Sequence, residues 1–153
     1  AVGDIDNDSY LEIAVATYSG SCYLINHDGS IAPGFPTAHG ATIRASAALA
    51  DLNADGDLEI IFGALNGTLH AVETSGGEIS GFPVTLGGGF FASPAVGDFT
   101  GDGQPDIIIG SSTGYIYGVS RTGATLTHFP IPPWGSTRPI YGTAAMGYLD
   151  QGN

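Results

Sequence analysis

The fold is decided by the stretch from Asp51 to Glu59, Asp-Leu-Asn-Ala-Asp-Gly-Asp-Leu-Glu, which runs directly into the apolar segment Ile60-Ile61-Phe62-Gly63. Side-chain oxygens at the first, third and fifth positions of a tight turn, a carbonyl at the seventh and a carboxylate at the ninth form the oxygen-rich shell that Ca²⁺ prefers. Gly56 at the sixth position supplies the left-handed backbone that the bend needs. The closing acid stands at the ninth position, not at the twelfth as in an EF-hand. The stretch therefore predicts a calcium loop that leads into a buried β-strand.

This pattern occurs three times, at an interval of 47 residues. Glycines and Phe-Pro dipeptides keep the same interval, which makes the repeat the strongest signal in the chain. The predicted metal ligands are Asp4, Asp6, Asp8, Tyr10 and Glu12 in the first loop, Asp51, Asn53, Asp55, Asp57 and Glu59 in the second, and Asp98, Thr100, Asp102, Gln104 and Asp106 in the third. In each loop the seventh residue (Tyr10, Asp57 or Gln104) is expected to contribute its backbone carbonyl. The cofactor expected is Ca²⁺, up to three ions, one per complete loop.

Each unit holds apolar, β-branched segments separated by turn signals, and no stretch keeps a helical period. Four antiparallel strands in roughly 40 to 50 residues are the size of a β-propeller blade. The sequence therefore predicts an all-β fold, with one propeller segment over 1–153. We expect blade units at 1–45, 46–92 and 93–142 and the first strand of an incomplete fourth unit at 143–153. The Phe-Pro segments 31–37, 81–86 and 127–131 are expected to form edge strands, where proline is tolerated.

Composition excludes some classes of function. The chain of 153 residues carries 15 acidic and 3 basic residues, a formal net charge of −12. Eleven of the acidic residues lie in the three loops, where their mutual repulsion needs a cation to offset it. There is no positive field for a nucleic acid, and no apolar run approaches the roughly 20 residues of a membrane span. The single Cys22 stands where the next units have Leu69 and Ile116, which predicts a small buried hydrophobe.

These residues carry a resemblance to a known family. The Gly-Asp-x-x-x-Asp-Gly pattern, Phe62-Gly63-Ala64 and the Gly-Phe-Pro edges resemble the FG-GAP and VCBS-type repeats of integrin-like propellers, especially those of secreted bacterial proteins. The resemblance covers essentially the whole chain and implies blades that bind Ca²⁺ between their first two strands. Two positions depart from it. Ser9 replaces the loop glycine, which implies backbone strain of roughly 1 kcal/mol, and Thr100 replaces an acid, which implies a weaker third site.

The number of blades is small for a closed ring. Propellers close with four to eight blades, whereas this chain encodes three units and one further strand. An open fan of three blades leaves apolar sheet faces in water. We therefore expect the chain to be a piece of a longer propeller, or to associate with itself.

The leading functional hypothesis is a non-catalytic, extracellular binding or adhesion module for a protein or glycan ligand. Weak calcium loops suit the millimolar calcium outside cells. Residues ahead of the first strand of a unit often reach the ligand face of a propeller, and here these are Arg44, Phe91 and Tyr141, with Trp134 nearby. The alternative is structural, with Phe91 and Tyr141 packed between blades and Trp134 capping a loop.

Two other functions stay open. One is the propeller portion of a secreted polysaccharide-degrading enzyme, which would need two free carboxylates. Outside the loops and Asp150, only Asp28, Glu73 and Glu78 remain. The other is a structural or filament-forming subunit. We expect His70 to be structural, because Tyr23 and Tyr117 hold its place in the other units, and His27, His39 and His128 to lie on the surface. No Cys/His spacing of a zinc site is visible, and catalysis within this chain is not expected.

Overall fold

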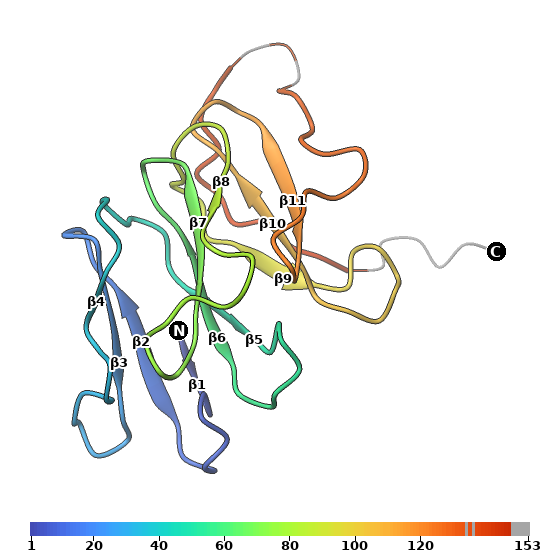
Figure 1. The fold of residues 1–153 in the computed structure, drawn as a ribbon. Helices are drawn as coiled ribbons and strands as arrows, with labels where there is room; N and C mark the ends of the chain where they lie inside the picture. Colours follow the sequence, from blue (N-terminus) through green and yellow to red (C-terminus); the bar gives the residue numbers. More distant parts are fainter. Residues whose placement is uncertain (134, 136, 148–153) are drawn as a thin grey trace.

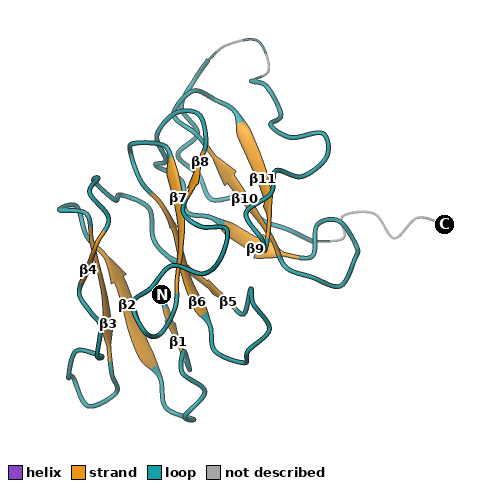
Figure 2. Ribbon diagram, in the orientation of Figure 1, coloured by secondary structure: helices purple, strands orange, loops and turns teal. Residues whose placement is uncertain are grey.

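The computed structural model describes residues 1–133, 135 and 137–147. Over these residues the chain forms strands joined by turns and loops, and none of them is helical. It follows that the described part holds no helix with the length and apolar character needed to cross a membrane. The strands form three antiparallel sheets that follow one another along the chain, spread like a fan (Figures 1 and 2). The predicted all-β fold is confirmed.

We call the three sheets blade 1, blade 2 and blade 3. Blade 1 contains β1 (Val2–Gly3), β2 (Glu12–Ala16), β3 (Ser21–Ile25) and β4 (Thr37–Ala38). Blade 2 contains β5 (Ala48–Ala50), β6 (Glu59–Gly63), β7 (Thr68–Val72) and β8 (Val84–Thr85). Blade 3 contains β9 (Ala95–Gly97), β10 (Asp106–Gly110) and β11 (Ile116–Ser120). Strands adjacent in sequence are hydrogen-bonded neighbours in every sheet, so each blade is a simple antiparallel meander.

The edge of blade 3 is shorter than the edges of the other two. Its fourth strand is a single bridge between Ile116 and Ile131, at the repeat position of the pairs that begin β4 and β8. The next pairing step in blades 1 and 2 uses the N–H groups of His39 and Leu86, each of which donates to a turn glycine. Blade 3 has Pro133 at that place, and proline has no N–H to donate. Pairing therefore stops at Ile131.

The edge strands begin later than the sequence suggested. Ile31 forms only an isolated bridge with Ile25, and regular pairing in blade 1 starts at Thr37. Between them, Gly34 has a φ of 90° and Pro36 carries no N–H, so the ladder is interrupted. The predicted strands at 31–37, 81–86 and 127–131 were thus too long. The Phe-Pro bonds of all three units are cis.

The core consists of two apolar layers, one between each pair of neighbouring blades. Ile60 and Phe62 of β6 point into the layer shared with blade 1, whereas Ile61 between them points into the layer shared with blade 3. All three side chains are fully buried. A strand covered on both faces needs apolar side chains at successive positions, which is why the segment after the second loop is continuously hydrophobic.

The outer face of blade 1 is open. Ile13 and Val15 of β2 hold the repeat positions of Ile60 and Phe62, yet they are 45% and 40% exposed, against 0% for the pair in blade 2. No blade precedes β1 in the described residues to cover them. This finding agrees with the expected shortage of blades.

The far side of blade 3 is partly covered by the C-terminal segment. Ile140 packs against Gly110, and Met146 packs against Gly97. Residues 143–147 do not form the predicted first strand of a fourth unit, because no neighbouring strand in the described part of the chain pairs with them. Residues 148–153 of that prediction lie outside the described residues.

Candidate metal centres

The three acidic loops connect the first two strands of each blade, and the first aspartate of each holds its loop in shape. Both carboxylate oxygens of Asp4, Asp51 and Asp98 accept backbone N–H groups from residues three to five positions further along. Because an ionised carboxylate accepts such bonds well, the turn is drawn around the side chain. The carboxylate of the first aspartate consequently lies inside its loop.

The fifth and seventh positions are also joined in every loop. The backbone N–H of the seventh residue donates to the side chain of the fifth at 2.8 to 2.9 Å in the pairs Tyr10–Asp8, Asp57–Asp55 and Gln104–Asp102. This contact places the seventh residue beside the predicted ligands. Coordination by the carbonyls of these three residues stays a prediction.

The acid at the ninth position anchors each loop from inside the protein. Glu12, Glu59 and Asp106 are buried, and each accepts the backbone N–H of the second loop residue. Burial raises the pKa of Glu59 to about 7, and the negative charges of Asp55 and Asp51 add to the rise. No ion pair involves this carboxylate in the part of the chain that the structure describes, and a bound cation would supply the missing positive charge.

The first loop brings three carboxylates together. Ligand oxygens of Asp4, Asp6 and Asp8 all lie within 4.8 Å of one another. The second loop has Asn53 and the third has Thr100 at the position of Asp6, so each offers a neutral oxygen there. The donor sets are entirely oxygen, as hard Ca²⁺ requires. The residues present therefore fit a calcium ion, and the first loop offers the most carboxylates among its predicted side-chain ligands.

The backbone of the loops follows the predicted geometry. The sixth position has a positive φ in all three loops, at Ser9 (76°), Gly56 (99°) and Gly103 (82°). The left-handed conformation expected for Gly56 is confirmed, and so is the conformation that implied strain at Ser9. The fourth position, which the sequence did not single out, is also left-handed.

The predicted ligand-binding residues lie in a row. The guanidinium carbon of Arg44 lies 5.8 Å from the ring centre of Phe91, whose own centre is 5.2 Å from that of Tyr141. On its other side Arg44 lies 5.2 Å from the ring centre of Tyr18. We call these four residues the aromatic–arginine row. Trp134, the remaining predicted residue, lies outside the described residues.

Tyr18 was missed by the sequence analysis. It belongs to the turn between β2 and β3, at a repeat position where the other units have Leu65 and Ser112, so periodicity gave no signal. The turn follows the C-terminal end of β2, whereas the first acidic loop precedes its N-terminal end. The aromatic–arginine row and the acidic loops therefore lie at opposite ends of the blades.

A second polar cluster lies between blades 1 and 2, away from the loops. It consists of His39, His70 and Glu78, whose ligand atoms lie within 4.8 Å of one another. The prediction that His39 lies on the surface was wrong, because its side chain is 7% exposed. It follows β4 directly and is packed against blade 2. Glu78, one of the carboxylates left outside the loops, is engaged by both imidazoles.

Comparison with protein families identifies the repeat. A model of the FG-GAP-like repeat matches residues 4–62, and a model of the FG-GAP repeat matches residues 90–126. The chain is an FG-GAP-type repeat protein. The matched ranges of this FG-GAP chain contain all three acidic loops. A search of the curated proteins gave no match.

Solved structures show the same architecture at low identity. BBS1N, from a complex with ARL6DN, is 19% identical, with a TM-score of 0.59 over 91% of the FG-GAP chain and 43% of the BBS1N chain. BamB from Moraxella catarrhalis is 20% identical, with a TM-score of 0.56 over 82% of the FG-GAP chain and 34% of the BamB chain. A protein of unknown function from Bacteroides caccae is 18% identical with a TM-score of 0.53 over 92% and 47%.

The chain thus spans less than half the length of each of these proteins. BBS1N and BamB are propeller proteins. The three blades of the FG-GAP chain form an open, partial β-propeller.

Proposed function

We propose that the chain is a calcium-stabilised propeller module that binds an extracellular ligand, without catalysis, through the aromatic–arginine row. The observation that carries the proposal is the convergence of Tyr18, Arg44, Phe91 and Tyr141 from three blades. Each residue comes from a turn or connection and not from a strand. Such segments can change without disturbing the sheets, which is why binding residues often occur there.

The row has the chemistry of a recognition surface. Tyr18 and Tyr141 are 66% and 68% exposed, although aromatic rings contribute most to stability when they are buried. Arg44 lies between Tyr18 and Phe91 and presents up to five N–H donors in a rigid plane. Flat ring faces and a planar donor group match the faces and hydroxyls of a sugar. We therefore favour a carbohydrate ligand, with a protein ligand as the second class.

The acidic loops support the module in a different way. They lie at the opposite end of the blades, so calcium there fixes the strands without touching a ligand on the row. Loops with few or exposed ligands bind calcium weakly and fill only at the millimolar concentrations found outside cells. A cell-surface or secreted location follows from this proposal.

A glycan array probed in calcium tests the binding role. The wild-type chain is compared with Arg44→Ala and Phe91→Ala, and Arg138→Ala serves as a matched control, since it removes an exposed arginine outside the row. We expect the two row variants to bind at least tenfold more weakly, about 1.4 kcal/mol, with unchanged melting temperatures.

One result would count against the row, and another would count against a carbohydrate ligand. One is a glycan bound equally well by all variants, which would place the ligand elsewhere. The other is the absence of any glycan hit together with capture of a defined extracellular protein that depends on Arg44, which would transfer the site to the protein class.

A further inference from the structure

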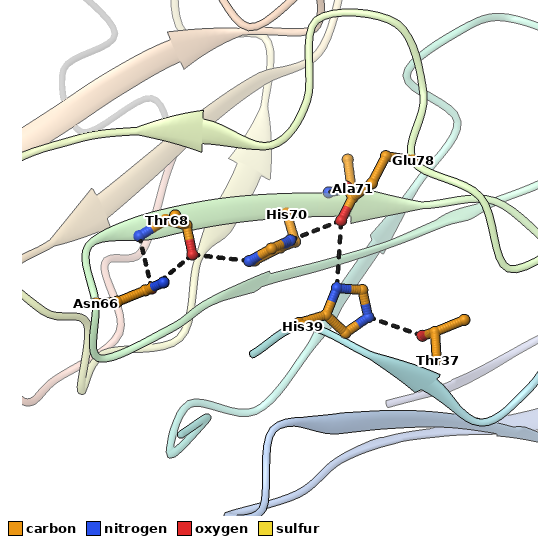
Figure 3. Close-up of polar contacts among 7 residues, drawn as sticks. All are labelled: Thr37, His39, Asn66, Thr68, His70, Ala71 and Glu78. Atoms are coloured by element: carbon orange, nitrogen blue, oxygen red, sulfur yellow. Dashed lines mark hydrogen bonds and ion pairs between the residues drawn. The ribbon is translucent and has the colours of Figure 1, made fainter. Parts of the chain in front are cut away.

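Two histidines and a glutamate from neighbouring blades converge on one point (Figure 3). His39 follows β4 of blade 1, His70 lies within β7 of blade 2, and Glu78 lies in the hairpin after β7. Nδ1 of His70 is 2.6 Å from Oε1 of Glu78, and Nδ1 of His39 is 3.3 Å from the same oxygen. The two imidazoles therefore turn the same ring atom toward one carboxylate oxygen.

A chain of hydrogen bonds fixes which nitrogen of His70 carries a proton. The backbone N–H of Thr68 donates to Oδ1 of Asn66, which identifies that atom as an oxygen. The hydroxyl of Thr68 donates to the same oxygen at 2.6 Å, so its single proton is already used. It must accept the 2.8 Å hydrogen bond from Nε2–H of His70. His70 therefore holds its proton on Nε2 and turns Nδ1 toward Glu78.

An Nδ1 lone pair cannot face a carboxylate oxygen at 2.6 Å without a positive charge between or on them. Either a proton lies between the two atoms, on Nδ1 or on the carboxyl of Glu78, or a metal ion replaces that proton once the contact has opened. Metal-binding histidines characteristically donate their other ring N–H to a fixed acceptor, which sets the ring orientation and the tautomer. Thr68 supplies such an acceptor to His70, and the hydroxyl of Thr37 lies 2.7 Å from Nε2 of His39.

The surroundings hold both rings rigidly and away from water. The side chains of His39 and His70 are 7% and 5% exposed. Phe62 stacks on His70 with ring centres 5.1 Å apart and meets the edge of His39 at 4.9 Å. Glu78 is fixed through its second oxygen, which accepts the backbone N–H of Ala71 at 3.0 Å. All three candidate ligands are thus held in place before any ion arrives.

We propose that His39, His70 and Glu78 form a site for a divalent transition metal of the Zn²⁺ class, bridging blades 1 and 2. Two imidazole nitrogens and one carboxylate oxygen form a zinc donor set that leaves a fourth position for water. At zinc–ligand distances near 2.0 to 2.1 Å, tetrahedral ligands stand about 3.3 Å apart.

The contact between His39 and Glu78 has that spacing already, at 3.3 Å. The contact between His70 and Glu78 must open by about 0.7 Å to admit a metal. The 21% exposure of Glu78 leaves room for this small shift of Oε1 while the other oxygen stays bonded to Ala71. The site is chemically distinct from the oxygen-only acidic loops. It does not depend on the proposed calcium or ligand binding, and its effect is to tie one blade to the next.

Cobalt absorption tests the proposal directly, because four-coordinate Co²⁺ bound by imidazoles and a carboxylate gives visible bands far more intense than those of the aqueous ion. The wild-type chain is stripped with chelator, saturated with Ca²⁺ so that the acidic loops are filled, and titrated with Co²⁺ and then Zn²⁺. We expect bands that saturate at one Co²⁺ per chain, disappear when one equivalent of Zn²⁺ is added, and accompany a higher melting temperature.

Variants separate this cluster from other sites. His70→Gln and Glu78→Gln should each weaken Zn²⁺ binding at least tenfold by calorimetry. Thr68→Val keeps every ligand but removes the acceptor that fixes His70, so it should cost 10- to 100-fold, whereas Thr68→Ser should restore binding. His128→Asn, which changes an exposed histidine outside the cluster, should change nothing.

Two outcomes would overturn the proposal. One is a folded wild-type chain that gives no cobalt bands and takes up no Zn²⁺, which would leave a proton between His70 and Glu78. The other is Zn²⁺ binding that is indifferent to both Glu78→Gln and Thr68→Val, which would place the ion elsewhere. Thermal melts of each variant show that it is folded, and Thr68→Val leaves all three ligands in place.

Discussion

The backbone N–H of Leu52 donates a 2.6 Å hydrogen bond to Oε2 of Glu59, closing the second acidic loop from within. The glutamate is buried, and the negative charges of the aspartates Asp55 and Asp51 add to the rise of its pKa that burial causes. A buried anion beside two other anions is stable only with a counter-charge or a proton. The loop is therefore built around a charge that the protein itself does not balance.

The calcium-free chain should lose stability as pH rises through this carboxyl. Burial raises the pKa of Glu59 from 4.5 to about 7, so between these values the folded state binds more protons than the unfolded state. The free energy of unfolding consequently falls with rising pH, by roughly 3 kcal/mol between pH 4.5 and 7. Urea denaturation in chelator over this pH range measures the fall.

Two comparisons make this result specific. Glu59→Gln should flatten the profile, Glu73→Gln should leave it unchanged, and saturating calcium should abolish the fall because a cation favours the ionised form. If the free energy of unfolding of Glu59→Gln fell with pH as steeply as that of the wild type, the fall would belong to another titrating group.

Thr100 gives the third loop a neutral side chain at its third position, and replacing it with an acid should strengthen calcium binding there. Thr100→Asp gives that loop the same three aspartates as the first loop, and calcium affinity rises with ligand charge. Calorimetry in an Asp4→Asn, Asp51→Asn background reports the third loop alone. We expect tighter binding by at least tenfold, with lower stability in chelator through added repulsion. Thr100→Ser, which keeps a neutral oxygen, should bind like the wild type, and equal affinities for Thr100→Asp and Thr100→Ser would argue against a metal in this loop.

Equivalent isoleucines in two blades should differ in their contribution to stability. Ile60 is fully buried between blades 1 and 2, so Ile60→Ala should cost 2 to 5 kcal/mol. Ile13 occupies the same repeat position but is 45% exposed, and Ile13→Ala should cost less than half as much. Chemical denaturation of both variants gives the comparison. Equal costs would show that the outer face of blade 1 is covered in solution.

The single thiol should be inert in the folded chain. Cys22 is fully buried, and burial, with a contribution from the charge of Glu78, raises its pKa to about 12. Because the thiolate is the reactive form, iodoacetamide at pH 8 should leave Cys22 unmodified until urea unfolds the chain. Mass spectrometry counts the adducts, and stoichiometric labelling of the native chain would contradict the packing between blades 1 and 2.

Local patterns in the sequence were enough to predict the repeat, the all-β fold and the acidic loops. Each of these depends on residues close together in one unit: Gly56 fixes a turn, and the apolar run after Glu59 fixes a doubly covered strand. The short edge of blade 3 was not predicted, although Pro133 cannot donate the hydrogen bond that extends the pairing.

Contacts formed between blades could not be predicted from one sequence. His39, His70 and Glu78 meet only because blade 1 packs on blade 2, and their spacing matches no metal motif. Three of the four residues of the row were predicted, because Arg44, Phe91 and Tyr141 precede the expected first strands of their units. Tyr18 was missed, because it joins them from a turn whose equivalents are not aromatic.

Calcium titration by calorimetry, paired with thermal melts in calcium and in chelator, tests the central claim most directly. The account predicts calcium affinity that is highest in the first loop and lowest in the third. The heat of each binding event should disappear in the matching variant, Asp4→Asn, Asp51→Asn or Asp98→Asn. It also predicts a higher melting temperature in calcium, since each tenfold excess of free ion over the dissociation constant adds about 1.4 kcal/mol per site. A folded chain that gives no heat and melts at the same temperature in calcium and in chelator would contradict it.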